Sequence, residues 1–412
     1  MFMKKEVLAI VLCFFIIGCA EQAVESEEIQ NQQQEADPSE EAQLPEESLP
    51  EPIVEIQERE PLPEETEQPS CDHYLLSNLP VNLDTIDHIE PMGSLHGEHV
   101  TPIDHQYFHK FGNTVANIEL FSPADGTITS MQHMGSFQGD DKNREPMDDY
   151  RLVIEHDCGL STIFIHIDKL SDRIKEVAPE FGKYKPVNLD VKAGELLGWF
   201  DESSDFNVVD QNFQIQWINP ASYTSDQNRG HIQDPFLNFP EPLKSALIDK
   251  SLRTAKPEGG TLDNDIDGTL QGVWFKEGTN GYGGISQERY WADHLAIVPD
   301  SIDTEHILFS VGTFEGRAQQ FGVKGNAPHP ADVTVDSGAV EYELVGYGYY
   351  HNDQPWDFKG LTKDLKIKNN DDVRGVAVVQ LVEGRKLKLE LFEGKTGSQV
   401  NGFTDKAAIY ER

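Results

Sequence analysis

The amino-acid sequence predicts a mostly β protein in which two β domains follow one another. Short segments of alternating apolar and polar residues recur along the chain, and Asp-Gly or Gly-containing turns separate them, as at Asp125-Gly126 and Gly384. Helical periodicity is weak except over residues 170–177. We expect an antiparallel β-core domain over residues 71–239, a linker over 240–261, and a second all-β domain, either a sandwich or a barrel, over 262–412.

Residues 1–18 have the features of an export signal. Lys4 and Lys5 precede an apolar run over residues 7–17, which is too short to span a bilayer. The run ends at Gly18-Cys19, which resembles the processing site of a lipoprotein signal. After cleavage there, Cys19 would carry lipid and hold the protein on a membrane surface outside the cytoplasm. An ordinary secretory signal that happens to contain a cysteine is the alternative, and it also exports the protein.

Residues 19–70 are expected to form a disordered acidic tether. They are rich in Glu, Gln and Pro, their single basic residue is Arg59, and they contain no aromatic residue and no Gly. Such a segment cannot bury enough apolar surface to offset the entropy of ordering it, and its prolines argue against a helix. The formal net charge of the whole chain, -39, argues against nucleic acid as a partner.

The cysteines agree with export. Cys13 leaves with the signal and Cys19 takes the lipid, so Cys71 and Cys158 remain. In an oxidising compartment, two remaining cysteines most economically form a disulfide, and two free thiols are the alternative.

Three motifs occur in a fixed order within residues 71–239. They are Ser122-Pro123-Ala124-Asp125-Gly126-Thr127-Ile128, the segment 152–167 with His156 and His166, and Val191-Lys192-Ala193-Gly194-Glu195-Leu196-Leu197-Gly198. In this order they resemble the core of the lysostaphin-type (LytM-like) zinc endopeptidases. The resemblance covers about a quarter of the chain and implies an antiparallel β-core with a shallow metal groove.

The resemblance also implies a set of site residues. His99 and Asp104 match the first pair of metal ligands, with one residue more between them than in the family, and His105 adds an imidazole beside Asp104. His166 matches a catalytic histidine. In the last motif, where the family has two histidines, this chain has Ser203 in place of the catalytic one and Asp205 in place of the metal ligand.

These replacements weaken the expected chemistry. Zinc accepts imidazole and carboxylate ligands alike, so His99, Asp104 and Asp205 can still be expected to hold it. Two carboxylates, however, reduce the ability of the ion to acidify water and polarise a carbonyl. Ser203 removes a proton-transfer partner, which costs about 10²–10⁴ in rate. The sequence therefore favours binding or scaffolding of a peptide, protein or envelope polymer, with an active zinc-dependent endopeptidase as the alternative.

The second domain is predicted from hairpins. Segments 333–335 and 340–344 flank Asp336-Ser337-Gly338, and segments 376–382 and 387–392 flank a turn at Gly384. Gly272-Val273-Trp274 is similar to the GxW that opens lipocalin barrels, although a core tryptophan explains it as well.

One further segment resembles a metal loop. Residues 263–268 place carboxylate or amide oxygens at alternate positions before Gly268, as in the first half of an EF-hand calcium loop. The twelfth position, where that loop needs an acidic ligand, is Trp274. An acidic turn is therefore the alternative.

Overall fold

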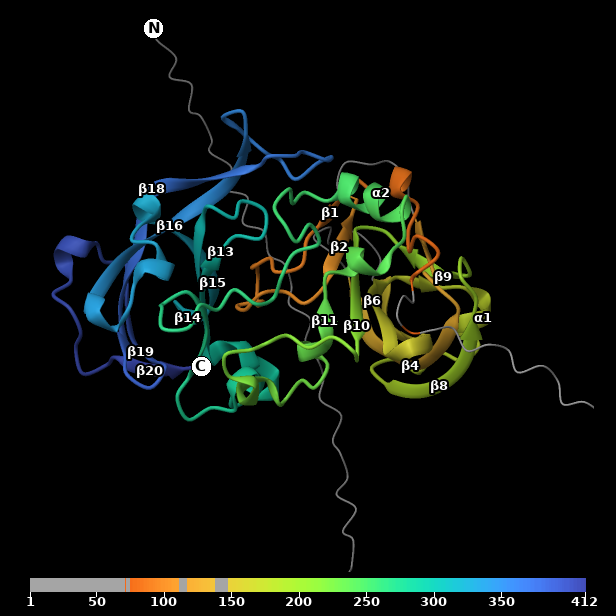
Figure 1. Ribbon diagram of the computed structural model, residues 1–412, viewed down its shortest axis with the longest axis horizontal. Coiled ribbons are helices and arrows are strands. Elements are labelled where there is room, and N and C mark those ends of the chain that lie inside the picture. The colour runs from red at the N-terminus through yellow and green to blue at the C-terminus, as the bar shows by residue number, and fades with distance from the viewer. Residues whose placement is uncertain (1–70, 72–74, 111–116, 138–146) are drawn as a thin grey trace, which may run out of the picture.

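The computed structural model describes residues 71, 75–110, 117–137 and 147–412. The expected signal peptide, Cys19 and the tether lie outside the described residues. The described chain is mostly β, with antiparallel sheets, as the sequence predicts (Figure 1). No helix in this part of the chain has the length and apolar character needed to cross a membrane.

The first half of the chain forms an eight-stranded sheet and a smaller three-stranded sheet. The large sheet has the order β1-β2-β10-β6-β5-β4-β8, with β11 paired to β10, and the small sheet has the order β3-β9-β7. The strands of the large sheet are β1 (His88–Glu90), β2 (Gln106–His109), β4 (Gly126–Phe137), β5 (Met147–Glu155), β6 (Leu160–Ile167), β8 (Tyr184–Val191), β10 (Ser203–Asp210) and β11 (Ile232–Gln233). The small sheet is made of β3 (Ile118–Phe121), β7 (Lys169–Leu170) and β9 (Leu196–Phe200).

One apolar core fills the space between these two sheets. Phe108, Phe164 and Phe206 point into it from three neighbouring strands of the large sheet, and each is almost fully buried. Helix α1 (Asp172–Lys175) and helix α2 (Leu243–Lys250) pack their apolar residues Ile174 and Leu247 against the same core. Helix α2 falls in the segment expected to be a linker, so part of that segment belongs to the first core.

The three motifs take structural roles in this fold. His156 joins two of them, because its Nδ1 lies 2.8 Å from the carbonyl oxygen of Asp125 and its Nε2 lies 2.9 Å from the hydroxyl of Thr162. Gly198 lies so close to the backbone carbonyl of Lys169 that a Cβ there would collide with it. A glycine is therefore required where β9 meets β7.

Cys71 and Cys158 form a disulfide, with 5.2 Å between their Cα atoms and a sequence separation of 87. This confirms the predicted pairing. In the chain-entropy account, closing a loop of this length stabilises the fold by about 4–5 kcal/mol.

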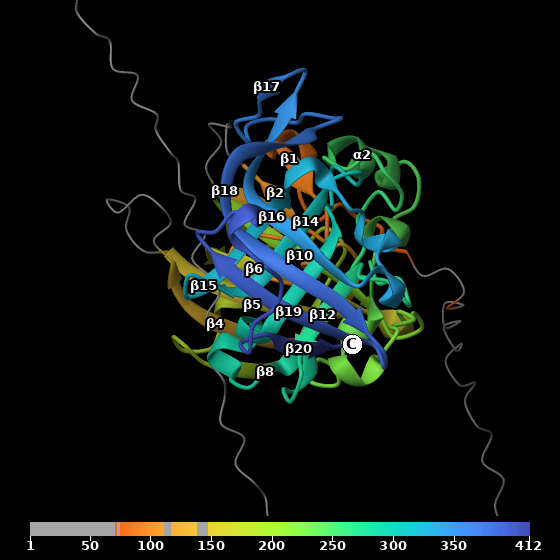
Figure 2. The ribbon, with the colours of Figure 1, turned by 90° about the vertical axis from the view of Figure 1, so that its left-hand side faces the viewer.

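The second half of the chain is a closed barrel. Each of the eight main strands pairs with the next in sequence, and the last pairs back to the first, all antiparallel (Figure 2). The strands are β12 (Gly272–Lys276), β13 (His294–Pro299), β14 (Ile307–Phe314), β15 (Arg317–Val323), β16 (Ala339–His351), β18 (Lys366–Val382), β19 (Lys386–Glu393) and β20 (Ala408–Glu411). The short strand β17 (Gln354–Pro355) pairs with the end of β16. Of the two expected forms, the chain thus adopts the barrel, in the up-and-down arrangement that lipocalins also use.

The barrel interior is packed with side chains. Trp274, Phe309 and Tyr342 lie within it, each with no exposed surface. An eight-stranded barrel is just wide enough for its own side chains to fill it. The core role for Trp274 is therefore confirmed.

One of the two predicted hairpins is wrong. Residues Val335–Ser337 form a 3₁₀ turn, and residues 333–335 are not a strand. Thr334 and Ser337 exchange side-chain hydrogen bonds with the backbone in a capping box, which satisfies donors that a strand ladder would otherwise use. The other hairpin is confirmed, since β18 and β19 pair from Val382 and Lys386 onward.

The two halves share a second apolar core. From the first half, Ile163, Val209 and Trp217 contribute to it, and from the barrel Val273 and Phe275 do, among others. Because neighbouring residues of a strand point to opposite sides, Val273 and Phe275 face outward from the barrel while Trp274 faces inward. The outer wall of the barrel therefore packs against one face of the large sheet, as the two views agree (Figures 1 and 2).

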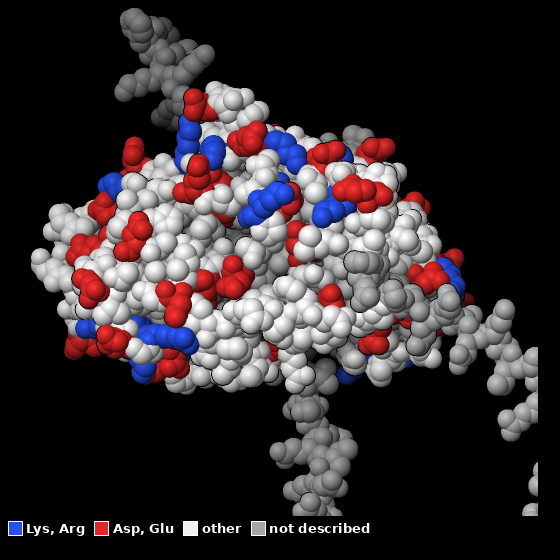
Figure 3. All heavy atoms as spheres, viewed as in Figure 1, with Lys and Arg blue, Asp and Glu red and all other residues white. Residues whose placement is uncertain are grey.

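Charged side chains of both signs are interspersed over the face of the molecule shown in Figure 3. No broad basic surface of the kind that binds nucleic acid is visible on that face.

Candidate functional site

The predicted site lies on the face of the large sheet that is turned toward the barrel. In β10, Phe206 and Val208 enter the first core, so Asp205 and Val209 point to the opposite face. Asp205 pairs with Tyr107 in β2, which places it beside the residues that begin that strand. The polar side chains of β2 and β10 therefore meet where the barrel covers the sheet.

His166 reaches this face through an irregularity in β6. Leu152 pairs with Phe164 and Tyr150 with Ile167, so β6 carries one residue more than β5 at this point. Such a bulge redirects a side chain and recurs near functional sites. His166 has a φ of 61°, a left-handed conformation that is uncommon for residues with a side chain.

His105 connects the predicted residues. Its Nδ1 lies 2.7 Å from Oδ1 of Asp104, and its Nε2 lies 3.2 Å from Oδ2 of Asp205. The Nε2 of His166 lies 3.7 Å from the same Asp205 oxygen, and its Nδ1 lies 3.2 Å from Asp149. The structure thus brings Asp104, Asp205 and His166 together, and we call these residues with His105 the acidic site.

His99 lies at the edge of the acidic site. Its ring is 5.9 Å from the ring of His105, centre to centre, and equally far from that of His96. Burial, together with the neighbouring charges of His96 and His105, lowers the pKa of His99 to about 3. A neutral His99 is thus favoured at any pH at which the protein is expected to work.

The carboxylates of the acidic site shift the pKa of His105. Burial by itself lowers the pKa of His105, but the charge of Asp205 and the hydrogen bond to Asp104 outweigh it, so the pKa is raised. Burial likewise raises the pKa of Asp104, but the hydrogen bond from His105 and the charges of His105 and Arg229 outweigh it and hold that pKa well below its usual range. His105 thus takes up a proton more readily than an isolated imidazole.

Arg229 supplies a second cation. Its Nη1 lies 3.5 Å from Oδ2 of Asp104, its Nη2 donates to the carbonyl of Pro102 at 2.7 Å, and its side chain is 3% exposed. Nη1 also donates to the hydroxyl of Tyr282 at 3.0 Å, and the guanidinium lies 4.2 Å from the centre of that ring. Tyr282 follows β12 of the barrel, so Arg229 joins the acidic site to the other half of the molecule.

A second cluster of imidazoles surrounds Glu90. The two carboxylate oxygens of Glu90 lie 3.5 Å from Nε2 of His96 and 2.9 Å from Nε2 of His109. The ring of His88 lies 5.1 Å, centre to centre, from the ring of His109 and 5.4 Å from that of Trp356 in the barrel half, tilted against both. Burial, with the nearby charge of His109, lowers the pKa of His88 to about 3.

The barrel half covers much of this face. Gln320 donates to the carbonyl of Gly97 at 3.1 Å, and the hydroxyls of Ser94 and Ser301 lie 2.8 Å apart. Asp205 is 2% exposed and His105 is 6% exposed, whereas the side chain of His166 keeps 26% of its surface. A long polymer therefore reaches the acidic site only at Asp104 and His166, whose side chains are 25% and 26% exposed, unless the halves separate.

The acidic site does not fit a metal ion as it is arranged. Oδ2 of Asp104, an expected ligand, lies 3.5 Å from the permanent charge of Arg229, which would repel a metal ion bound there. Asp104 is already neutralised by Arg229 as well as by His105. Within the described ranges, no three His, Cys, Asp or Glu side chains form a group able to hold a metal ion.

The sequence did not reveal the roles of His105, Asp149 and Arg229. His105 adjoins the matched Asp104, so its position was the available signal. Arg229 follows Asp104 only after six strands of the large sheet have intervened, and no motif of the resemblance contains it. Its proximity depends on the connection between β10 and β11.

Arg412, directly after β20, packs against the segment that resembles a calcium loop. Arg412 is 5% exposed, and its guanidinium donates to the carbonyls of Gln271, Ile266 and Thr269 at 2.5, 2.7 and 2.7 Å. It lies 4.2 Å from the ring centre of Trp274 and 3.8 Å from Asp265. Asp265 accepts from the backbone N–H of Val273 at 2.7 Å, so it closes the turn onto β12.

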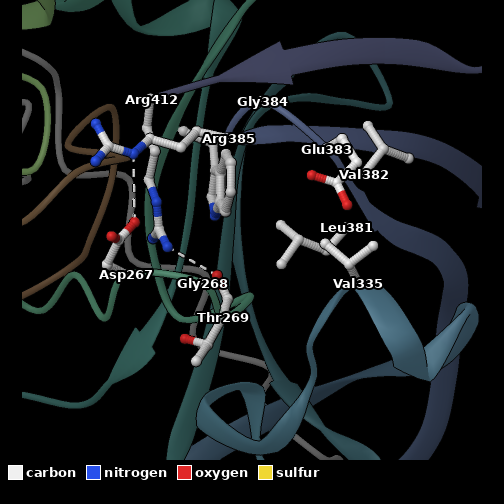
Figure 4. Close-up of a pocket in the computed structure, with 11 residues that line it drawn as sticks. Asp267, Gly268, Thr269, Val335, Leu381, Val382, Glu383, Gly384, Arg385 and Arg412 are labelled. Carbon is white, nitrogen blue, oxygen red and sulfur yellow. Dashed lines mark hydrogen bonds and ion pairs between the residues drawn. The ribbon is translucent and has the colours of Figure 1, made fainter.

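A recess of about 230 Å³ opens beside Arg412 at this end of the barrel (Figure 4). Val335 and Leu381 give it an apolar side, and Arg385, which lies 3.3 Å from Asp267, borders it on the other. It is lined by residues 267–269, Trp274, Val335, residues 381–385 and Arg412. It lies in a different part of the molecule from the acidic site.

Comparison with known proteins gives only distant likenesses. No family model matches the chain, and no curated protein matches it significantly. Among solved structures, the chain is similar to a zinc-containing peptidase from Vibrio cholerae, with 18% identity and a TM-score of 0.23 over 33% of this chain and 37% of that one. It is also similar to a structure of the SpoIIQ–SpoIIIAH pore-forming complex, with 11% identity and a TM-score of 0.25 over 42% of this chain and 96% of that one. The chain thus spans well under half of the Vibrio peptidase, and at these scores neither likeness carries an argument about activity.

Proposed function

We propose that this chain is a lipid-anchored extracytoplasmic protein whose first half is a peptidase-like domain used for binding or scaffolding at the cell envelope. Lipid on Cys19 would hold it to the membrane surface, and residues 20–70 would lift the folded part away from it. The partner would be a peptide, a protein or an envelope polymer.

The observation that carries the non-catalytic part of this proposal is the cover over the acidic site. The sheet face that bears Asp205 shares an apolar core with the barrel, and the carboxylates of Asp104 and Asp205 are compensated by His105 and Arg229. A hydrolytic site needs access for the substrate and a group ready to accept a proton. Ser203 offers no imidazole where the resemblance implies a second catalytic histidine, so His166 stands without that partner.

A specific observation keeps zinc-dependent peptide cleavage as the second candidate. The Nε2 atoms of His105 and His166 both lie close to one oxygen of Asp205, and His166 is held in an uncommon backbone conformation. These are zinc-ligand types. If the halves separated and His105 lost its proton, such a group would be able to recruit the ion.

The deciding experiment is a cleavage assay on the full-length protein in detergent, with a mixed peptide library and isolated envelope material as substrates. We expect no cleavage above that of the His166→Ala variant, with or without added zinc, and we expect co-sedimentation with the envelope material. Chelator-sensitive cleavage that is lost in His166→Ala would establish the second candidate instead. Membrane fractionation of Cys19→Ala tests the anchor separately, because that variant should move to the soluble fraction.

A further inference from the structure

We propose that the guanidinium of Arg229 is a built-in counter-ion that takes the place of a metal ion in the acidic site and fastens that site to the barrel. The inference rests on the proposed non-catalytic function and names the group that keeps the site in that state.

The contacts of Arg229 give the first argument. A side chain that only packed at the seam would not need to direct a charge at a carboxylate, yet Nη1 lies 3.5 Å from Asp104 while the guanidinium is almost fully buried. Asp104 is one of the two carboxylates that the LytM-like resemblance implies as ligands. The charge of Arg229 therefore stands beside an expected metal ligand.

The charge balance gives the second argument. The guanidinium of Arg229 is almost fully buried, and an unpaired buried charge is costly, so it requires a carboxylate partner. Oδ2 of Asp104 is that partner, at 3.5 Å from Nη1, while Oδ1 of Asp104 lies 2.7 Å from His105. A divalent ion bound to Asp104 would face the repulsion of the permanent charge of Arg229.

The position of Arg229 gives the third argument. It belongs to the 3₁₀ turn Arg229–His231, and it binds the carbonyl of Pro102 in the segment that leads to Asp104. Through its hydrogen bond and ring contact with Tyr282 it also binds the barrel half. One side chain thus fixes the acidic site and the cover at the same time, so loss of its charge should free both.

The test measures zinc binding by calorimetry, and Co²⁺ binding by its absorption spectrum, on untagged full-length protein in detergent. Arg229→Met removes the charge but keeps an apolar stem, and Arg229→Lys keeps the charge. Arg412→Met is the matched control, because Arg412 is equally buried against an aromatic ring and lies in the barrel.

We expect neither ion to bind stoichiometrically to the wild type, Arg229→Lys or Arg412→Met. Arg229→Met should bind one ion per chain at least about tenfold more tightly than the wild type, since one repelling charge a few Å from the site is gone. The added His166→Ala exchange should abolish that gain. Equal and weak binding by folded Arg229→Met and Arg412→Met would overturn the inference.

Stoichiometric zinc on the wild type, lost in His166→Ala, would overturn it as well, and this result does not depend on whether Arg229→Met folds. If Arg229→Met does not fold, absence of zinc from both the wild type and Arg229→Lys supports the inference. Peptide cleavage by the zinc-free wild type would contradict the proposed function but leave the role of Arg229. Zinc bound to the wild type without cleavage would contradict the role of Arg229 but leave the proposed function.

Discussion

Arg229 and Arg412 occupy corresponding roles in two acidic segments that the sequence relates to metal loops. Both guanidinium groups are buried, and each lies 4.2 Å from the centre of an aromatic ring and within 4 Å of an Asp carboxylate. Arg229 depends on side chains from both halves of the molecule, Asp104 and Tyr282, whereas Arg412 donates to three backbone carbonyls within the barrel.

The pKa values of the two carboxyl groups beside these arginines, Asp104 and Asp265, differ accordingly. Asp104 has two cations beside it, and its pKa is held well below the usual range. Asp265 has mainly Arg412, and burial outweighs that charge and raises the pKa of Asp265 to about 6. Exposure contributes to this difference, because the side chain of Asp104 is 25% exposed and that of Asp265 only 5%. One buried arginine is thus not enough to keep the more deeply buried carboxyl group ionised, whereas Asp104 also has the hydrogen bond from His105.

Low pH should produce the largest difference in stability between the contact of the two halves and strands β19 and β20 of the barrel. Burial lowers the pKa of His88 and of His294 to about 3 from 6.5, and both histidines lie at the contact between the halves. The unfolded chain binds these protons at higher pH than the folded one, so the stability they contribute is full above about pH 6.5 and is lost as the pH falls toward 3. At pH 4 the loss should be on the order of 5 kcal/mol. Amide exchange at pH 4 should rise in β1 and β13 before it rises in β19 and β20, and uniform exchange throughout would contradict this.

Removal of each arginine should come next in size. Arg229→Met should reduce the free energy of unfolding by about 2–3 kcal/mol, because Asp104, whose side chain is 25% exposed, and the carbonyl of Pro102 lose a charged partner. Arg412→Met should cost less at low pH than at neutral pH, because Asp265 takes up a proton readily. Urea unfolding at pH 5 and pH 7.5 tests this. Equal pH dependence of the two losses would show that the two sites do not differ as described.

Neutralising the carboxyl group should cost more stability at Asp104 than at Asp265. Asp265 favours its protonated form in the fold, so its ionisation opposes folding as the pH rises from 3.8 through 6, by about 3 kcal/mol at pH 7. Asp265→Asn should therefore change stability at pH 7 by no more than about 1 kcal/mol, while Asp104→Asn should lose about 2–3 kcal/mol. Thermal unfolding measures both, and a larger loss at position 265 would be inconsistent with the pKa assigned to it.

The smallest expected effect concerns the uncharged groups that accept hydrogen bonds from the two arginines. Tyr282→Phe removes the hydroxyl that accepts from Arg229 and should cost about 1 kcal/mol. Ile266→Val leaves the backbone carbonyl that accepts from Arg412 and, because the Ile266 side chain is 41% exposed, should cost less. Comparing the two urea midpoints shows whether the loss of the side-chain acceptor of Arg229 reduces stability more than a change that keeps the backbone acceptor of Arg412. Identical losses would mean that the Tyr282 hydroxyl adds nothing.

The fold was more predictable from the sequence than the site. Alternation in 387–392 and the Gly384 turn predicted β19 and its pairing, because those signals are local. The failed hairpin at 336–338 shows the opposite case, since side-chain bonds of Thr334 and Ser337 override the apparent strand pattern. The family motifs located Asp104, Asp205 and His166, but their roles as ligands or catalytic residues stay predictions.

Arg229 and the barrel cover were not predictable in the same way. Both depend on contacts between residues far apart in the chain, and hydrophobic alternation does not say which outer face of a barrel will find a partner. Val273 and Phe275 flank the core Trp274, so three successive apolar residues in β12 were the available sign that both faces of that strand are buried. The sign did not identify the partner surface.

The Cys71–Cys158 bond also sets how the molecule would respond to mechanical load. In the proposed anchored form, tension between the membrane and a bound envelope polymer enters the folded part at Cys71. The bond transfers that force directly to the turn between β5 and β6, at the centre of the large sheet. The chain between the two cysteines, about 300 Å if fully extended, is shielded from the pull. Under oxidising conditions the tether would thus act on a short and stiff attachment, and reduction of one bond would lengthen it.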